Sequence, residues 1–372
     1  MYKYKKWNVD GIHSIMAKEG RGECMAITIK DVAQLANVAP STVSRVIANN
    51  PRISEKTKLR VRKAMEKLGY HPNFIARSLA NQSTKIIGLV LPSSSIGCYQ
   101  NPFFSRILQG LSEGAQENQY SLLLSTGKTE GEIYDGVVKM VQGGMVDGII
   151  LMYSRVNDNI LTYLRERGFP FVMIGKPYDF IEEIMYVDND NVLAADQATN
   201  YLIQHGHEKI GFIGGDLNLV MTLDRLTGFQ RALNRAGITP RNEYTLHDEF
   251  LHEGGQAAAK KLLSIDEPPT ALVVSDDLMA LGVVQSLREF GIRTPEEMSI
   301  VSFNNVLFSE LSLPALTSMD IDIFALGFQA AKGIVQMLQT GDAPMAAIIP
   351  HQFVERHSCR SIKQGAMAAM NY

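Results

Sequence analysis

The stretch TIKDVAQLANVAPSTVSRVI (residues 28–47) holds two short amphipathic patterns of helical period, separated by a tight break. Thr28 and Asp31 have the spacing of a capping box, which predicts the start of the first helix. The apolar face expected for this helix consists of Val32, Leu35 and Ala36. Pro40 suits the first position of a second helix, because that position needs no backbone N–H donor. Two short helices joined in this way predict a helix-turn-helix.

A third helix is expected to support these two. The segment SEKTKLRVRKAMEKLG (residues 54–69) has Ser54 as a candidate N-cap and Gly69 just past its end. The inward face expected for the second helix consists of Val43, Val46 and Ile47. The inward face expected for the third consists of Val61, Ala64, Met65 and Leu68. Three small helices with these faces predict an all-α DNA-binding headpiece.

The outward side of the second helix is where base reading is expected. Its residues are Ser41, Thr42, Ser44 and Arg45. Small polar side chains can approach base edges in the major groove, and Arg45 could bind the O6 and N7 atoms of a guanine. Thr28, Ser54 and Lys56 suit phosphate contacts, which position a protein without reading sequence. The alternative, that these are ordinary solvent-facing residues, stays open, above all for Ser44.

Charge is divided unevenly along the chain. Residues 26–85 contain 11 Lys and Arg against 3 Asp and Glu, whereas the whole chain has a net charge of −3. Residues 86–372 carry a net charge of −13. A basic module joined to an acidic one favours a polyanionic partner for the basic module. A solvated basic helix surface would produce the same count.

From residue 86 onward, apolar segments of strand length alternate with helical patterns. The expected strands are IIGLVLP (86–92), SLLLST (121–126), VDGIILM (146–152), FPFVMIG (169–175), MYVDND (185–190), KIGFIGG (209–215), TALVVS (270–275) and MSIVSF (298–303). Repeated β-α units of this kind predict parallel sheets covered by helices on both faces. Their number fits two doubly wound lobes better than one.

Ligands of doubly wound sheets bind beyond the carboxyl ends of strands, so a site is expected there. The candidates are Phe103, Phe104, Asp190, Arg225, Asp276, Asp277, Asn304 and Asn305. Two adjacent aromatic rings could sandwich a sugar ring or a base, although each is as readily core. Arg225, expected at the opening of a helix, has a planar fork suited to hydroxyls or a carboxylate. Asn191 is expected to cap a helix, as is Asp276 or Asp277, which leaves one of these two for a ligand.

Several classes of protein are disfavoured. The chain has no G-x-G-x-x-G or P-loop in a strand-to-helix setting, and no Ser-His-Asp set or metal-ligand cluster stands out. We therefore expect no enzymatic activity, no cofactor and no metal. No apolar run is long enough to span a bilayer, and three scattered cysteines do not predict disulfides. A cytoplasmic protein without membrane contact is expected.

The stretches TIKDVAQLANVAPSTVSRVI (28–47) and GYHPNFIARSLANQST (69–84) resemble the headpiece and hinge of the LacI/GalR family of bacterial transcription regulators. The resemblance implies a two-lobed periplasmic-binding-protein-like core, and a homodimer on double-stranded, pseudo-palindromic operator DNA. It implies DNA contacts by Thr28, Ala39, Pro40, Ser41, Thr42 and Arg45, and a minor-groove wedge at Leu79. It implies effector contacts by Phe103, Phe104, Arg225, Asp276 and Asn304.

Three departures from the family pattern bear on the effector. Asn304 stands where many sugar-responsive members have an aspartate, Ile321 where a polar residue is common, and Lys176 near an acidic position. Within the family, NPFF (101–104) and SFNNV (302–306) are similar to regulators of maltose operons. That implies maltose or a related gluco-oligosaccharide as a small effector. We expect the effector to relieve repression, while corepression, which uses the same fold, stays open. A periplasmic-type sugar-binding protein is the alternative, but it would need a signal peptide and no DNA module.

The expected domain organisation follows from these patterns. HPNFIARSLANQST (71–84) is expected to be helical only on DNA, because so short and polar a segment cannot nucleate a helix alone. Met25 precedes the first capped helix directly, so we expect residues 1–24 to be a non-native or disordered extension. The expected parts are a headpiece 25–70, a hinge 71–84, a core 85–360 and a tail 361–372. The expected lobes are about 85–186 with 322–344, and about 187–321 with 345–360.

Overall fold

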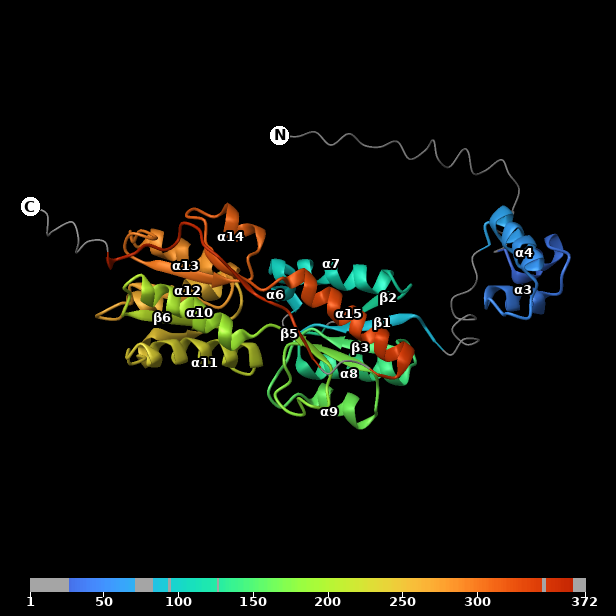
Figure 1. The fold of residues 1–372 in the computed structure, drawn as a ribbon, viewed down its shortest axis with the longest axis horizontal. Coiled ribbons are helices and arrows are strands. Elements are labelled where there is room, and N and C mark those ends of the chain that lie inside the picture. Colours follow the sequence, from blue (N-terminus) through green and yellow to red (C-terminus); the bar gives the residue numbers. More distant parts are fainter. Residues whose placement is uncertain (1–26, 71–82, 93–94, 126, 343–345, 364–372) are drawn as a thin grey trace, which may run out of the picture. The chain divides into compact units, whose positions relative to one another are not determined.

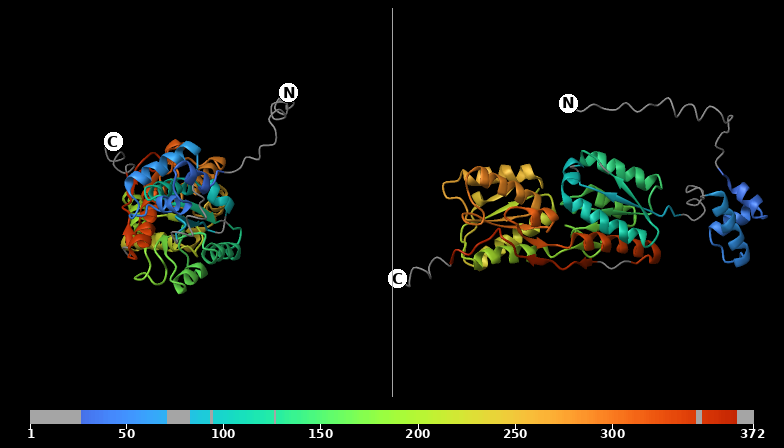
Figure 2. Two further views of the ribbon diagram at one scale, coloured as in Figure 1. Left: turned by 90° about the vertical axis from the view of Figure 1, so that its right-hand side faces the viewer. Right: turned by 90° about the horizontal axis from the view of Figure 1, so that it is seen from above.

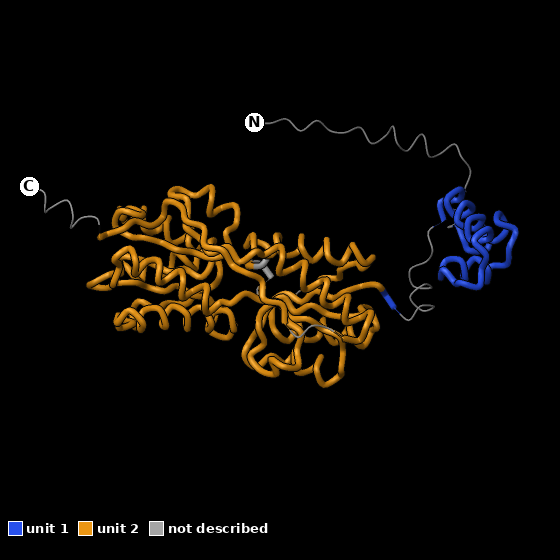
Figure 3. The backbone as a smooth tube through the Cα atoms, in the orientation of Figure 1, with its two compact units in different colours: residues 1–84 blue, residues 85–372 orange. Residues whose placement is uncertain are grey.

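The computed structural model describes residues 27–70, 83–92, 95–125, 127–342 and 346–363. The chain divides into two compact units, Met1–Thr84 and Lys85–Tyr372 (Figure 3). The division falls at the residue where the core was expected to begin. The predicted extension 1–24 and all but two residues of the predicted hinge lie outside the described residues, as does most of the tail.

The first unit is a bundle of three helices, α2 (Ile29–Leu35), α3 (Pro40–Ile47) and α4 (Glu55–Leu68) (Figure 1). Their shared core consists of Val32, Ala33, Ala36, Val43, Val46, Val61 and Ala64. The prediction that Leu35 faces inward is wrong, because its side chain is 43% exposed. Val32, Ala33 and Ala36 face the other helices, and Leu35 lies about 100° around the helix from the centre of that face.

The ends of these helices carry the predicted caps. The carboxylate of Asp31 accepts hydrogen bonds from the backbone N–H and the hydroxyl of Thr28, both at 2.7 Å. The hydroxyl of Ser54 accepts from the N–H of Thr57 at 3.4 Å. Gly69 ends α4 with a φ of 63°, a left-handed conformation that glycine adopts without a Cβ clash. The predicted helix boundaries of the headpiece are therefore confirmed.

The second unit has two lobes, each built on a six-stranded sheet (Figures 1 and 2). The first sheet has the order β11-β5-β4-β3-β1-β2 with parallel pairings throughout its described strands. Its strands are β1 (Ile86–Val90), β2 (Ser121–Ser125), β3 (Gly148–Leu151), β4 (Phe171–Ile174), β5 (Tyr186–Asp188) and β11 (Ala346–Ile348). The second has the order β12-β10-β9-β8-β6-β7, with β10 and β12 antiparallel. Its strands are β6 (Ile210–Gly214), β7 (Thr245–His247), β8 (Ala271–Val274), β9 (Ser299–Phe303), β10 (Thr317–Asp320) and β12 (Gln352–Val354).

Helices cover both faces of each sheet, as the two-sided burial of the strands requires. On the first sheet, α7 (Pro102–Gln116) and α15 (Ile323–Thr340) lie opposite α8 (Glu130–Gln142) and α9 (Asn159–Glu166). On the second, α10 (Asn191–Gln204) and α11 (Val220–Arg235) lie opposite α12 (His252–Leu263) and α13 (Asp277–Glu289). Shorter elements are α6 (Ser95–Gln100), η1 (Asn242–Tyr244) and α14 (Leu307–Leu311). Within the described residues, no helix is long and apolar enough to cross a membrane.

All eight predicted strands are present, and the structure adds four that sequence reasoning missed: β7, β10, β11 and β12. β7, β10 and β12 contain polar residues and lack the apolar run by which the others were recognised, whereas β11 lies in the short apolar run AAII (346–349), which was not assigned. The missed strand β11 also changes a lobe boundary. It pairs with β5 in the first lobe, whereas residues from 345 onward were expected in the second.

The chain crosses between the lobes three times: after β5, before α15 and between β11 and β12. Asn189 lies in the first crossing. Its side-chain amide donates to the carbonyl oxygens of Ile321 and Ile349, each at 2.9 Å. Because Ile321 and Ile349 belong to the second and third crossings, a single side chain joins all three.

The close packing of α7 against α15 depends on glycine. A Cβ on Gly110 would lie 2.1 Å from the carbonyl oxygen of Phe324. We expect Gly110→Ala to lower the free energy of unfolding of the core by about 1–3 kcal/mol, because the two helices must move apart. Urea unfolding followed by circular dichroism measures this change.

Gly131→Ala in α8 is the matched control. Its nearest neighbouring atom would lie 3.9 Å from the new Cβ, so the extra methyl group has space. The higher helix propensity of alanine should leave the free energy of unfolding unchanged or raise it by up to about 1 kcal/mol. Equal stability of the Gly110→Ala variant and the unaltered protein would contradict the packing argument.

Candidate DNA-binding surface and effector pocket

The start of α3 presents the residues predicted to read bases. Ala39, Pro40, Ser41, Ser44 and Arg45 are exposed, and Thr42 is half-buried. In the part of the chain that the structure describes, no hydrogen bond or ion pair engages the guanidinium of Arg45. Small side chains beside an unengaged guanidinium leave this surface able to approach base edges.

The hydroxyls of Thr28 and Ser54 are used inside the headpiece. Thr28 donates to Asp31 and Ser54 accepts from Thr57, so each hydroxyl holds a helix end. The phosphate contacts expected of these residues stay predictions. Leu79, the predicted wedge, lies outside the described residues.

Basic side chains are exposed throughout the headpiece. They are Lys30, Arg45, Arg52, Lys56, Arg60, Arg62, Lys63 and Lys67. Lys58 differs from them because it is buried and pairs with Glu55 at 2.7 Å. An excess of exposed positive charge of this kind attracts the phosphate backbone of nucleic acids.

A cavity of about 140 Å³ lies between the two lobes of the second unit. It sits at the carboxyl ends of the strands, the usual ligand position in such sheets. The predicted effector residues that line it are Phe103, Phe104, Arg225, Asp276 and Asn304. It also contains polar residues not predicted as effector contacts: Asn101, Ser154, Asp188, Asn189, Asn191 and Ser275. The rings of Phe103 and Phe104 meet edge to face, with centroids 5.2 Å apart.

Asp276 accepts hydrogen bonds from both lobes. Its Oδ1 caps α13 by accepting from the N–H groups of Leu278 and Met279, at 2.7 and 3.2 Å. Its Oδ2 accepts from the side-chain amides of Asn304 at 2.8 Å and Asn101 at 2.9 Å. Asn101 belongs to the first lobe, so this last contact crosses the cavity. Burial raises the pKa of Asp276 to about 6.

Asn101 is the pocket residue that sequence reasoning most clearly missed. It is the N-cap of α7, where its Oδ1 accepts from the N–H of Phe103 at 3.0 Å. This cap orients its Nδ2 toward Asp276 and toward the carbonyl oxygen of Phe250, at 2.9 and 3.3 Å. An asparagine before a proline at a helix start is a capping signal, and it could have identified Asn101.

Arg225 is buried, with 1% of its surface exposed. Its Nε donates to Oδ1 of Asn191 at 2.9 Å, and its Nη1 donates to the carbonyl oxygen of Ser275 at 2.6 Å. The guanidinium carbon lies 4.3 Å from the centre of the Phe303 ring. Desolvation lowers the pKa of Arg225 to about 10, against the opposing effect of nearby carboxylates. Arg225 was predicted to lie at the start of a helix. The helix α11 begins at Val220, so Arg225 lies in its second turn instead.

The structure exchanges the predicted roles of Asp190 and Asn191. Asp190 is exposed and caps α10 by accepting from the N–H of Leu193 at 2.8 Å. It is not among the residues that line the cavity. Asn191 is buried in the cavity wall, and its amide donates to Oδ1 of Asp188 at 3.0 Å. Because α10 begins one residue earlier than was expected, the cap is Asp190 and the pocket position passes to Asn191.

Asp188 and its neighbours form a second link between the lobes. The Oδ2 of Asp188 accepts from the backbone N–H of Lys176 at 2.8 Å, and burial raises the pKa of Asp188 to about 6. The ammonium group of Lys176 pairs with the carboxylate of Asp224 at 2.8 Å. Asp224 lies on α11, so this ion pair also joins the first lobe to the second.

Asp277 stabilises the fold of the second lobe and does not line the pocket. Its carboxylate accepts hydrogen bonds from the hydroxyls of Ser302 and Ser318 and from the N–H of Val306. These groups attach α13 to the ends of β9 and β10. Of the two neighbouring aspartates, Asp276 therefore both caps a helix and lines the cavity, whereas Asp277 is enclosed by its own lobe.

A helix-turn-helix unit joined to a two-lobed core with a cavity between the lobes defines a ligand-controlled DNA-binding regulator. Residues 28–73 match the model of "Bacterial regulatory proteins, lacI family". Residues 199–359 match the model of a "Periplasmic binding protein-like domain". The chain belongs to the LacI family, a non-enzymatic family of bacterial transcription regulators.

Relatives extend the match over nearly the whole chain. The HTH-type transcriptional regulator MalR of Streptococcus pneumoniae is 41% identical, over 89% of this chain and 100% of that protein. The structure of the transcriptional regulator CelR–cellobiose complex has a TM-score of 0.71 at 30% identity, covering 89% of this chain and 99% of that one. The lac repressor dimer bound to operator and the anti-inducer ONPF shares the fold, with a TM-score of 0.78 at 24% identity over 90% and 99% of the two chains. The predicted family and fold class are confirmed.

The buried carboxyl of Asp277 makes stability depend on pH. Burial raises its pKa from 3.8 to about 7. Between these values the native state holds a proton that the unfolded chain releases, so this carboxyl makes the free energy of unfolding fall as pH rises from about 4 to about 7. The fall attributable to Asp277 is up to about 4 kcal/mol.

Asp277→Asn isolates this effect, because its amide can donate to the two serine hydroxyls and accept from Val306. We expect urea unfolding of the core at pH 5, 6 and 7 to show a smaller loss of stability for this variant than for the unaltered protein. Equal losses in the two proteins would mean that Asp277 does not titrate in this range.

Proposed function

We propose that the protein represses a carbohydrate-utilisation operon, and that maltose or a related gluco-oligosaccharide bound between the lobes relieves the repression. The observation that carries this proposal is the convergence of Arg225, Asp276 and Asn304 on one cavity between two lobes. MalR regulators among the relatives and the cellobiose in the CelR structure support a glucose-containing sugar. A periplasmic-type sugar-binding protein would leave the basic headpiece without a role.

The chemistry of the cavity suits a neutral, hydroxylated ligand. A sugar hydroxyl both donates and accepts, and the contact between Asn304 and Asp276 offers amide donors beside carboxylate acceptors. The edges and faces of Phe103 and Phe104 provide apolar surface for the C–H groups of a sugar ring. Where Asn304 replaces the family's common aspartate, it lowers the negative charge of the pocket without removing its hydrogen bonds.

The small volume of the cavity suggests how binding is coupled to DNA. Pockets for small molecules usually measure about 300–1,000 Å³, more than twice the volume found here. A disaccharide therefore requires the lobes to separate, which breaks the contact from Asn101 to Asp276 and the ion pair of Lys176 with Asp224. A ligand that prefers one lobe arrangement shifts the population toward it and so alters the spacing of the two DNA-binding modules in a dimer.

Pairing of two chains is proposed to place two headpieces on a pseudo-palindromic operator. The second lobe exposes large apolar side chains on α14 and just after it: Leu307, Phe308, Leu311 and Leu313. Several large exposed apolar side chains on one short segment are typical of a protein interface. On DNA, residues 71–84 are proposed to become helical and to insert Leu79 into the minor groove. This activity places the protein in the cytoplasm with its operator.

The effector is tested with Asn304→Gly. Asn304 has a φ of 102°, so glycine keeps the backbone and removes only the amide. We expect maltose or maltotriose binding to weaken at least about tenfold, because a lost hydrogen bond in the pocket costs about 1.5 kcal/mol. Isothermal titration calorimetry measures the affinity.

Gln119→Gly is the matched control, since Gln119 also has a positive φ, 59°, and lies outside the pocket. Its sugar affinity should equal that of the unaltered protein. Gel-shift titrations with and without each sugar then measure operator affinity. If neither maltose nor maltotriose changes operator affinity, the effector assignment fails.

Base reading is tested with Arg45→Ala. We expect a loss of about 1–3 kcal/mol for each lost base contact on a duplex selected from random sequences, and little loss on a scrambled duplex. Arg60→Ala, on α4, removes the same charge and should weaken binding to both duplexes alike. Gel-shift titrations at fixed salt compare the two variants. A loss of equal factor on both duplexes for Arg45→Ala would show that Arg45 contacts phosphate only.

A further inference from the structure

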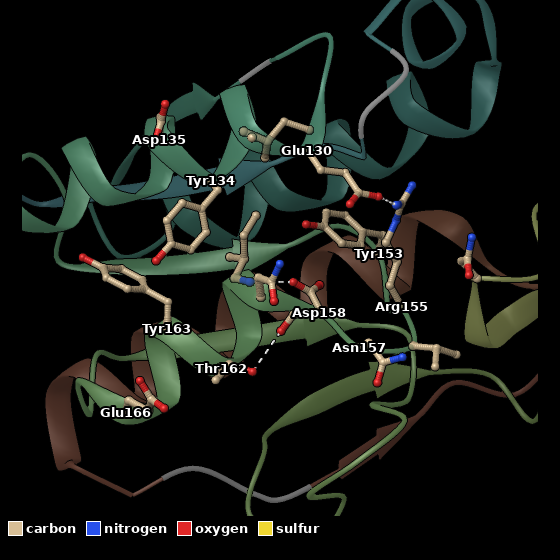
Figure 4. Close-up of a pocket in the computed structure, with 16 residues that line it drawn as sticks. Glu130, Tyr134, Asp135, Tyr153, Arg155, Asn157, Asp158, Thr162, Tyr163 and Glu166 are labelled. Atoms are coloured by element: carbon tan, nitrogen blue, oxygen red, sulfur yellow. Dashed lines mark hydrogen bonds and ion pairs between the residues drawn. The ribbon is translucent and has the colours of Figure 1, made fainter.

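A second cavity, of about 840 Å³, lies on the first lobe between α8 and α9 (Figure 4). Its wall is formed by α8, the segment that follows β3, and α9, and it reaches Asn218 of the second lobe. It is much larger than the cavity between the lobes, and neither the expected DNA contacts nor the expected effector contacts involve it. Among the described residues, Tyr153 alone lines both cavities.

Three tyrosine rings form the apolar part of this cavity. Tyr134 on α8 and Tyr163 on α9 meet edge to face, with centroids 5.6 Å apart (Figure 4). Tyr153, two residues after the end of β3, is buried. The negative faces of such rings attract cations, whereas they give an anion no comparable partner.

The polar part of the cavity has an excess of negative charge. Among the described residues that line it, the carboxylates are Glu130, Asp135, Asp158 and Glu166, and the one cationic side chain is Arg155. Arg155 is already engaged, because it pairs with Glu130, lies 4.0 Å from a carboxylate oxygen of Asp216 and covers the ring of Tyr153. A cleft lined by one sign of charge concentrates ligands of the opposite sign. Sugar phosphates and nucleotides are therefore disfavoured here.

Two buried polar atoms of this cavity lack partners. The Oδ1 of Asp158 caps α9 by accepting from the N–H groups of Ile160 and Leu161, at 2.8 and 3.2 Å. Its Oδ2 is buried without a hydrogen bond among the described residues, and so is the hydroxyl of Tyr163. Burial is also the main cause that raises the pKa of Asp158. A buried acceptor without a donor costs free energy, and a ligand that supplies an N–H group removes that cost.

We propose that this cavity binds an aliphatic polyamine, with an ammonium group donating to Oδ2 of Asp158 and methylene groups packed on the rings of Tyr134 and Tyr163. A polyamine is elongated, so its ammonium groups can reach carboxylates at separate points of the cavity wall. A single metal ion does not fit, since no group of three His, Cys, Asp or Glu side chains in the described parts of the chain is placed to hold one. The site is independent of the sugar assignment of the cavity between the lobes.

The position of the cavity gives its occupant contact with both lobes. The carbonyl oxygen of Asn218 accepts from the N–H of Val156 at 2.9 Å, and the N–H of Val220 donates to the carbonyl oxygen of Ser154 at 3.1 Å. These backbone contacts join the lobes at the rim of the cavity. A polyamine that reaches this rim favours the lobe arrangement seen here.

The proposal is tested by isothermal titration calorimetry of the full chain with spermidine at constant ionic strength. We expect saturable binding, weakened at least tenfold by Asp158→Asn. Asparagine keeps the helix cap and removes the charge. Glu208→Gln neutralises an exposed carboxylate outside the cavity and should leave the affinity unchanged.

A second pair of variants distinguishes the contribution of the Tyr163 ring from that of its hydroxyl, and it leaves the helix cap at Asp158 unchanged. Tyr163→Leu removes the aromatic face and should weaken spermidine binding about fivefold or more, whereas Tyr163→Phe keeps the ring and should stay within about threefold. Circular dichroism shows that each variant is folded. If Asp158→Asn does not fold, the Tyr163 pair decides.

Three results would overturn the proposal. Absence of saturable spermidine binding is the first. The second is equal binding of magnesium chloride, because the charge would then attract any counterion. The third is saturable binding of maltotriose, lost in Asp158→Asn, because the cavity would then be a site for neutral sugars.

Discussion

Arg225 brings a positive charge into the interior of the second lobe, and taking such a charge out of water costs several kcal/mol unless polar partners surround it. Those partners come from separate elements. Asn191 stands at the start of α10, Ser275 follows β8, and Phe303 ends β9. The guanidinium therefore requires two strand ends and one helix start to keep fixed relative positions. The geometry of the effector pocket follows from this requirement, since the same elements form its wall.

Carboxylates and asparagine amides complete the pocket by satisfying one another. Asp276 accepts amide donors from both lobes, and Asp188 accepts from Asn191 and from a backbone N–H of the first lobe's loop. The polar groups of the pocket are therefore largely hydrogen-bonded to one another before any ligand enters. A ligand gains affinity only where it replaces these bonds with equally good ones, which gives selectivity for molecules that can both donate and accept.

The headpiece could be predicted from the sequence more completely than the core, and the reasons are physical. Capping signals and buried apolar runs are local, so the headpiece helices and eight strands could be recognised from neighbouring residues. Leu35 was misplaced because a seven-residue helix carries too few turns to define its inward face. The four missed strands are stabilised by pairing with distant strands, and β7, β10 and β12 carry no apolar run of their own. The roles of Asn101 and Asp190 depend on which residue caps a helix. A shift of one position in the predicted start of the helix changes those roles. That five of the six predicted effector residues meet in one cavity required the topology of both lobes.

The amide of Asn189 has a mechanical consequence. Because it binds two carbonyl groups on the other crossings, the three segments between the lobes share a common pivot. Rotation about that pivot can keep both hydrogen bonds, whereas sliding one lobe along the other would break them. The lobes then move relative to each other by rotation about one axis. Occupation of the pocket can therefore be transmitted as a change in a single angle between the lobes.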